Sequence, residues 1–211
     1  MDRFSTDGRR RDASKLLYVG QIAAHKGVRT AVETLKLLRE GYDCDKATLT
    51  VVGGPDYGEE IARLVCSLGL ESVVRFTGLI PRERLPEIYR EHGTLIFPSV
   101  WDEPFSITLL EAMSSGLAVV GTETGGSAEL LADGVNALTF PRLDAEACAA
   151  QVKRLIDDPQ LFDRIRHNGM RAIESGYRLD HMIDKIEDSL ERVRAGIEGR
   201  SQSREPEGLY L

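Results

Sequence analysis

Short apolar runs alternate with longer amphipathic segments along this chain. Runs of four or five residues rich in β-branched and other apolar side chains predict six strands, at residues 16–20, 48–52, 73–77, 94–98, 117–120 and 136–140. Segments of helical period lie between and after them, at residues 28–40, 59–68, 84–90, 107–115, 128–131, 145–157 and 160–173. This alternation predicts an α/β fold with a doubly wound, Rossmann-like parallel six-stranded sheet. In such a fold the ligand binds beyond the carboxyl ends of the strands.

The end of the chain has a different pattern. Residues 179–193 predict one more helix, whose apolar stripe lies opposite a charged face. The stripe consists of Met182, Ile183, Ile186, Leu190 and Val193. Residues 196–211 are polar, contain glycine and have no periodicity, so they predict a mobile tail.

Composition narrows the class of protein. The 211 residues, 42% hydrophobic and 29% charged, are enough for one globular domain with a buried core. A net charge of −7 without a strong basic block argues against nucleic acid as a partner. The apolar runs are shorter than the roughly 20 residues that cross a bilayer, and the N-terminus has no apolar signal segment. We therefore expect no transmembrane segment and a cytoplasmic location. Three cysteines without zinc-site spacing predict no metal site.

The loop after the first predicted strand, GQIAAHKG at residues 20–27, contains one candidate cation. It matches neither the dinucleotide pattern G-x-G-x-x-G nor a P-loop, because Ile22 and His25 stand where glycines are needed. Lys26 remains at the start of the following helix. Taken alone, it is expected to be a solvated surface lysine.

The segment PSVWDEPFSITLLEAM, residues 98–113, suggests an anion site. Pro104 is suited to opening a helix, because its missing N–H has no helical partner there. The backbone N–H groups that follow would point out of the helix start and bind an anion. They belong to Phe105, Ser106 and Ile107. Glu103 and Glu111 would flank this site, although acids near a helix start can also act only on the macrodipole, worth roughly 0.3–1 kcal/mol each.

A glycine-rich segment, GTETGGSAE at residues 121–129, follows the fifth predicted strand. It brings flexible backbone to the same edge of the sheet. It is equally explained as a turn with Ser127 as a helix N-cap.

Together these segments resemble one family, the retaining glycosyltransferases of the two-domain GT-B type, and within them family 4, the glycosyl transferases group 1. The resemblance rests on the E-x7-E pattern of Glu103 and Glu111 in EPFSITLLEAMSSGLAVVGTETGGSAEL, on VGQIAAHKG and on RFTGLIPRERLPEIY, and it extends from residue 16 to 193. It covers only the C-terminal, donor-binding half of such an enzyme. The N-terminal acceptor-binding domain is therefore expected to be missing.

The resemblance also implies a division of the chain. Residues 1–14 would be a remnant of the linker, and residues 15–177 the Rossmann-like domain that binds the nucleotide sugar. Residues 178–195 would form a helix that crosses back to the missing domain, and residues 196–211 the tail. Peripheral contact of the full enzyme with a membrane stays open.

The resemblance implies roles for individual residues. The donor would be a nucleoside-diphosphate sugar, linked to UDP, GDP or ADP, and no metal or other cofactor would be needed. Lys26 and Glu103 would be catalytic, Lys26 acting on the diphosphate and Glu103 on the hydroxyls of the donor sugar. Glu111 would hold the ribose, and the backbone near Ile80 would contact the base. Further donor contacts would come from Gly20, Gln21, Phe105, Ser106 and Ile107.

One position departs from the family pattern. Gln21 stands where these enzymes usually have an arginine that clamps the diphosphate together with the lysine. A neutral amide donates hydrogen bonds but cannot neutralise charge. Three hypotheses follow: the donor-binding half of a hexosyltransferase that is inactive alone, a module that binds nucleotides or sugar nucleotides without turnover, and a structural domain that has lost its ligand.

Overall fold

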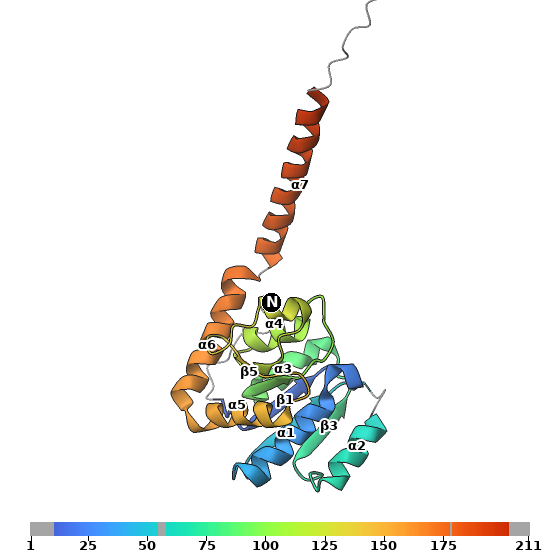
Figure 1. Ribbon diagram of the computed structural model, residues 1–211, viewed down its shortest axis with the longest axis vertical. Coiled ribbons are helices and arrows are strands. Elements are labelled where there is room, and N and C mark those ends of the chain that lie inside the picture. The colour runs from blue at the N-terminus through green and yellow to red at the C-terminus, as the bar shows by residue number, and fades with distance from the viewer. Residues whose placement is uncertain (1–10, 55–57, 178, 203–211) are drawn as a thin grey trace, which may run out of the picture.

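A six-stranded parallel sheet organises the computed structural model, which describes residues 11–54, 58–177 and 179–202 (Figure 1). The strand order is β3-β2-β1-β4-β5-β6, and every neighbouring pair is parallel. The strands are β1 (Lys15–Val19), β2 (Thr48–Val52), β3 (Val74–Gly78), β4 (Thr94–Phe97), β5 (Ala118–Gly121) and β6 (Leu138–Thr139). The order runs outward in both directions from the β1–β4 pair, so the predicted doubly wound sheet is confirmed.

Helices cover both faces of the sheet. They are α1 (Val28–Gly41), α2 (Gly58–Ser67), α3 (Leu85–Glu91), α4 (Ile107–Ser114), α5 (Ala145–Asp157), α6 (Pro159–Gly176) and α7 (Leu179–Gln202). Alternate residues of β1 point to opposite faces. Leu16 lies in a core cluster with residues of α1, α2 and α5, whereas Leu17 lies in a second cluster with residues of α3 and α4. The middle of β1 and nearly all of β2, β4 and β5 are buried, as expected for a sheet with helices on both sides.

Two predicted elements differ near the end of the sheet. The strand predicted at 136–140 is shortened to β6, because the Asn136 side chain bonds the backbone of Leu130 and Ala132 and closes a turn. The helix predicted at 128–131 is wrong. A 3₁₀ turn, η4 (Gly125–Glu129), begins earlier in the chain, where Gly125 adopts a positive φ of 50°. Its N-cap is Thr124, so the alternative of Ser127 as a helix N-cap is also wrong.

The last helix extends away from the sheet domain (Figure 1). It continues to Gln202, so residues 196–202 are helical although the sequence predicted the start of a mobile tail there. Extending an existing helix needs no new nucleus, which explains this continuation through a segment without periodicity. The apolar stripe predicted on this helix is exposed, with side chains 43–64% accessible. No helix in the described ranges is long and apolar enough to cross a bilayer.

Predictions at the chain ends lie mostly outside the described residues. This applies to residues 1–10 of the predicted linker and to residues 203–211 of the predicted tail. Arg11, the first described residue, is buried and donates hydrogen bonds to the carbonyls of Tyr89 and Ser115. This contact fixes the start of the described chain against the amino ends of the strands.

Candidate functional site

The loop after β1 is packed against the loop after β4. A short 3₁₀ turn, η2 (Ala24–Lys26), ends at Gly27, which has a φ of 71°. A Cβ atom at Gly27 would lie 1.9 Å from the Pro98 carbonyl oxygen, so only glycine fits between the loops. The Val100 amide also donates to the His25 carbonyl at 2.9 Å. These contacts bring Lys26 beside the segment that carries Glu103.

Lys26 and Glu103 form an ion pair at this junction. The Lys26 Nζ lies 2.9 Å from the Glu103 Oε1, and the two side chains are 26% and 11% exposed. The Ser99 hydroxyl donates to the same carboxylate oxygen at 2.8 Å. The other oxygen, Oε2, accepts no hydrogen bond from the described part of the chain. One oxygen therefore anchors Glu103, and the other can accept a ligand hydroxyl.

The start of α4 differs in detail from the sequence prediction. Pro104 does not open the helix, because α4 begins at Ile107 with Ser106 as its N-cap. The Ser106 side chain makes no capping bond. Within the described ranges, the backbone amides of Phe105, Ser106 and Ile107 donate to no protein acceptor outside regular secondary structure. Unsatisfied N–H groups at a helix start are suited to an anion.

Phe105 is held in place by an aromatic contact. Its ring stacks on the ring of Tyr177, at the end of α6, with 5.6 Å between centroids. Tyr177 in turn donates from its hydroxyl to the Glu129 carbonyl at 3.2 Å. The segment just before α4 is therefore held by α6 and the η4 turn as well as by the Glu103 contacts.

Glu111 lies in a second polar cluster, on α4 beside the β3–α3 connection. Its Oε2 accepts from the Tyr89 hydroxyl at 3.2 Å, and its Oε1 lies 3.5 Å from Arg82 Nη2. Burial raises the pKa of Glu111, while the Tyr89 hydrogen bond and the Arg82 charge oppose this rise. Burial and the Glu111 charge raise the pKa of Tyr89, which keeps its phenol protonated as the donor. The half-buried Ile80 lies in the same connection and packs against the core cluster below α3 and α4.

Gly20 and Gln21 form the rim of the β1 loop. The Gly20 amide donates to the Val52 carbonyl at 3.0 Å, and a Cβ atom on Gly53 would lie 1.9 Å from the Gly20 oxygen. The backbone of β1 and β2 is therefore in close contact here. Gln21 is exposed, and its carbonyl accepts from the buried Tyr18 hydroxyl at 2.7 Å.

Two further loops contact the Glu103 segment: the glycine-rich loop after β5, which the sequence placed at this edge of the sheet, and the loop after β6, which was not predicted. The Gly126 amide donates to the Glu103 carbonyl at 2.7 Å. A Cβ atom on Gly126 would lie 1.8 Å from the Pro104 oxygen. Arg142 follows β6 and bonds the same loop as Glu103. Its place directly after a predicted parallel strand is a signal that could have identified it, because the carboxyl ends of such strands share one edge.

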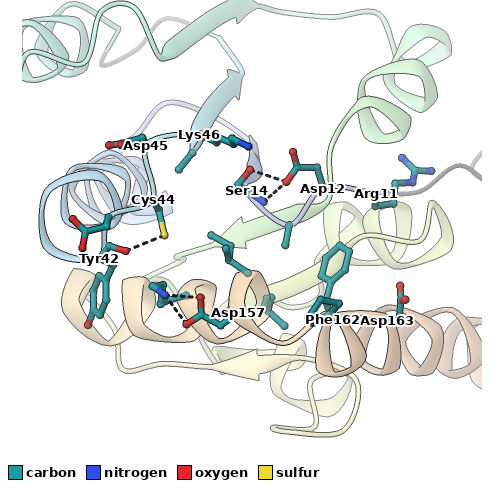
Figure 2. A pocket seen from close by; sticks show the side chains of 17 residues that line it. Arg11, Asp12, Ser14, Tyr42, Cys44, Asp45, Lys46, Asp157, Phe162 and Asp163 are labelled. Atoms are coloured by element: carbon teal, nitrogen blue, oxygen red, sulfur yellow. Dashed lines mark hydrogen bonds and ion pairs between the residues drawn. The ribbon is translucent and has the colours of Figure 1, made fainter.

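A separate cavity lies at the opposite edge of the sheet. Its volume is about 750 Å³, and it is lined by segments before β1 and β2, by the end of α5 and by the start of α6 (Figure 2). The labelled side chains in Figure 2 include Asp12, which accepts from Ser14, and Cys44, whose thiol donates to the Tyr42 carbonyl. None of the site residues predicted from the sequence lines this cavity. Across the described ranges, no group of three or more His, Cys, Asp or Glu side chains is arranged to hold a metal ion.

Comparisons with known proteins identify the family of this chain. The family model described as glycosyl transferases group 1 matches residues 4–172. The alpha-D-kanosaminyltransferase of Streptomyces kanamyceticus is 30% identical over 176 residues, which are 83% of this chain and 45% of that protein. A D-inositol 3-phosphate glycosyltransferase of Catenulispora acidiphila is 33% identical over 177 residues, 79% of this chain and 40% of that protein. The chain thus spans less than half the length of these relatives.

Solved structures show the same fold. The C-terminal domain of a glycosyl transferase group 1 family protein from Francisella tularensis has a TM-score of 0.74 and 25% identity, covering 84% of this chain and 97% of that one. An Anabaena protein, solved in complex with UDP, has a TM-score of 0.77 and 23% identity, covering 84% of this chain and 48% of that one. This chain belongs to the glycosyl transferases group 1 family and corresponds to the C-terminal domain of its members.

Proposed function

We propose that this chain is the donor-binding half of a retaining hexosyltransferase that takes its sugar from a nucleoside-diphosphate sugar. The observation that carries the proposal is the position of Lys26 against Glu103, beside the unsatisfied amides that precede α4. A cation and oriented N–H groups at the carboxyl edge of a Rossmann-like sheet suit a diphosphate. A carboxylate beside them suits the hydroxyls of the attached sugar.

The chemistry of sugar transfer matches this arrangement. Breaking the bond between the anomeric carbon and the phosphate oxygen leaves negative charge on the diphosphate, while the sugar gains positive charge. Preorganised donors aimed at the developing negative charge lower the barrier. Lys26 and the amides of Phe105, Ser106 and Ile107 would supply them. The Oε2 of Glu103 would accept from a sugar hydroxyl while its Oε1 stays bonded to Ser99.

Glu111 suits the ribose in this proposal. It is buried, yet it lies beside the exposed Arg82 and the connection that contains Ile80. A carboxylate there can accept both hydroxyls of a ribose diol, each as a charge-assisted hydrogen bond. The base would then lie against the backbone near Ile80.

The comparisons support a sugar nucleotide as the ligand. The Anabaena protein with the same fold was solved with UDP and also with UDP-glucose. The two curated relatives described above carry the names of sugar-transferring enzymes. UDP and UDP-glucose are therefore the first ligands to test, followed by GDP and ADP.

A second part of the proposal concerns the rest of the enzyme. Because the chain spans under half of its relatives, the acceptor would bind to a separate N-terminal domain. The sheet has its own core on both faces, so this half should fold alone. Without the surface that orients the acceptor, it should not transfer sugar, since orientation can supply several kcal/mol of the barrier reduction.

Gln21 favours the alternative of a binding module without turnover. A usual clamp of two cations would here be reduced to Lys26, which weakens stabilisation of the leaving group. Binding and turnover are separated by adding a cognate N-terminal domain to the chain and assaying transfer. Binding without transfer in the joined protein would support the module.

Calorimetric titration of the chain with UDP and UDP-glucose tests the proposal directly. We expect both ligands to bind and to raise the melting temperature, because a ligand specific for the native state stabilises it. Glu103→Ala should weaken the binding of UDP-glucose more than the binding of UDP. If UDP, GDP, ADP and their glucose derivatives all leave the melting temperature unchanged at millimolar concentration, the proposal is rejected.

A further inference from the structure

We propose that Arg142 is a positioning residue for Glu103, acting through Val100 and Asp102. This inference deepens the proposed function and rests on it, because Glu103 is there assigned to the sugar of the donor. Arg142 follows β6, and Glu103 lies in the loop after β4. The two residues belong to different loops at the same edge of the sheet.

Arg142 makes two contacts with the Glu103 loop. Its Nη1 donates to the Val100 carbonyl at 3.0 Å, and its Nη2 forms an ion pair with the Asp102 Oδ1. The two acceptors stand on either side of Trp101 in the chain. A planar guanidinium can hold two acceptors at once in fixed geometry, which an ammonium cannot. The contacts therefore restrain the backbone of the segment just before Glu103.

Asp102 passes this restraint to the loop after β5. The Asp102 oxygen that pairs with Arg142 also accepts from the Gly125 amide at 3.2 Å. The next amide, that of Gly126, donates to the Glu103 carbonyl at 2.7 Å. The backbone of Glu103 is thus bonded directly to the loop after β5, and its preceding residue is bonded to the loops after both β5 and β6.

The glycine residues leave this contact little freedom. A Cβ atom on Gly125 would lie 2.3 Å from the Glu103 oxygen, and one on Gly126 would lie 1.8 Å from the Pro104 oxygen. The backbone of Gly125 and Gly126 is therefore in direct contact with the backbone of Glu103 and Pro104. A change in the position of residues 100–102 must move the Glu103 backbone or break its bond to Gly126.

Stability alone does not explain the arrangement. The Arg142 and Asp102 side chains are 41% and 67% exposed, and exposed ion pairs contribute little to folding. The reaction rate depends more strongly than stability on such contacts, since a displacement of about 1 Å at a reacting group can reduce the rate about 100-fold. Lys26 and Ser99 fix the Oε1 of Glu103, and the Arg142 contacts fix the backbone from which that side chain extends.

The first test compares ligands with and without the sugar. In Arg142→Gln, we expect the Kd for UDP-glucose to rise about tenfold and the Kd for UDP to rise less than about twofold. Arg142→Lys keeps the charge but loses the fork, so it should recover only part of the UDP-glucose affinity. Arg75→Gln is the matched control, because Arg75, on β3, forms a similarly exposed ion pair with Glu91 at the end of α3. If Arg142→Gln lost equal affinity for UDP and UDP-glucose, or lost affinity for neither, the proposal would be overturned.

A second test needs no ligand. Trp101 is the only tryptophan of the chain, lies between the two acceptors of Arg142, and is 58% exposed. Its intrinsic fluorescence therefore reports on this segment alone. Arg142→Gln should lower its steady-state anisotropy and raise its quenching by acrylamide, whereas Arg75→Gln should change neither. Unchanged anisotropy in Arg142→Gln would show that the guanidinium does not restrain the loop, and would also overturn the proposal.

The two tests separate the inference from the proposed function. If the wild-type chain binds neither UDP nor UDP-glucose, the proposed function fails and the assigned role of Arg142 fails with it. If the wild-type chain binds both and Arg142→Gln behaves like Arg75→Gln, only the inference fails. A further check is the double variant of Arg142→Gln with Asp102→Ala. Its loss of UDP-glucose affinity should be smaller than the losses of the two single variants added together, because both residues share the Arg142–Asp102 ion pair.

Discussion

The ammonium of Lys26 lies 2.9 Å from the Oε1 of Glu103, joining the loop after β1 to the loop after β4. Both side chains are largely shielded from solvent, so water screens the pair only weakly. The Oε1 of Glu103 also keeps a hydrogen bond from Ser99. Under the proposed function, a diphosphate that approaches Lys26 would meet a cation already held in place, and Glu103 would retain a partner when the ammonium turns toward the ligand.

Lys26→Ala should weaken diphosphate binding specifically. A hydrogen bond to a charged group contributes about 1.5–3 kcal/mol, so we expect the Kd for UDP to rise roughly ten- to hundredfold. The affinity for uridine, which has no phosphate, should stay nearly unchanged. Calorimetry with both ligands measures the difference. Lys36→Ala is the control, since it removes a lysine of α1 that is as accessible as Lys26 and pairs with Glu40. An equal loss for uridine would contradict the assignment of Lys26 to the phosphates.

Glu111→Ala should abolish discrimination between ribose and deoxyribose. If its carboxylate accepts from the ribose diol, the wild-type chain binds UDP more tightly than 2′-deoxy-UDP, and the variant binds both alike. Glu103→Ala should keep the discrimination. Loss of discrimination in Glu103→Ala alone would reverse the roles of the two glutamates.

The raised pKa of Glu111 adds a pH dependence. Burial favours its protonated form in the folded protein, so its carboxylate is lost on acidification at a pH above the ordinary value of 4.5. The preference for UDP over 2′-deoxy-UDP should decline over the same range. The raised pKa changes the stability of the fold in the opposite direction with pH. The contribution of Glu111 to folding is fully present below pH 4.5 and is lost as the pH rises through the raised pKa, and Glu111→Gln should remove this dependence.

The sheet could be predicted from the sequence because each strand is a separate apolar run. Strand β2 and helix α5 have the predicted bounds, since both are defined by local patterns of burial. The short β6 and the η4 turn differ because side-chain bonds from Asn136 and the left-handed Gly125 decide the backbone there. Neither effect appears in a hydrophobic pattern.

The candidate site could be predicted only in part. Lys26 and Glu103 were each identified from their segments, but their contact depends on the close approach of Gly27 to Pro98. Glu111, which was predicted to flank the anion site, bonds Tyr89 of α3 and Arg82 of the connection before α3, and neither partner was predicted. Arg142 was missed because its partners are 40 and 42 residues away in the chain.

Gly126→Ala should destabilise the site and the fold. The new Cβ atom would lie 1.8 Å from the Pro104 oxygen, so backbone must move and the bond from the Gly126 amide to Glu103 must lengthen or break. Overpacking of this kind costs about 1–3 kcal/mol. Urea denaturation measures the loss. Gly41→Ala is the control, because a Cβ atom added there, at the end of α1, would meet nothing within 4 Å, and stability should change little or increase. Equal effects of the two substitutions would argue against the close contact at Gly126.

The exposed stripe of α7 should make the isolated chain self-associate. Ile186 and Leu190 are 50% and 64% exposed on a helix that extends away from the domain. Adjacent apolar side chains of this kind tend to become covered by another surface. Sedimentation velocity should therefore show a weight-average mass that rises with concentration. The double substitution Ile186→Ser and Leu190→Ser should abolish that rise without lowering the melting temperature of the domain. A concentration-independent monomer in the wild-type chain would contradict this expectation.

His92 should make the fold less stable in mild acid. Its ring is buried between α3 and β4, where Nδ1–H donates to the Ile88 carbonyl at 2.6 Å and Nε2 accepts from the Thr50 hydroxyl at 2.8 Å. Burial lowers the pKa of His92 below 6.5, although the Ile88 carbonyl and the Glu91 charge oppose this. The folded state therefore favours the neutral ring. Its contribution to stability is present above pH 6.5 and is lost as the pH falls through the lowered pKa.

The His92 effect can be isolated with two histidine variants. Between pH 7 and pH 5 the free energy of unfolding should fall more steeply in the wild-type chain than in His92→Asn, by up to about 1.4 kcal/mol per pH unit for one proton. Asparagine can still donate to the Ile88 carbonyl, so this variant should remain folded at pH 7. His167→Asn changes an exposed histidine on α6 and should leave the wild-type slope intact. Parallel slopes for the wild-type chain and His92→Asn would show that the buried ring does not govern the acid response.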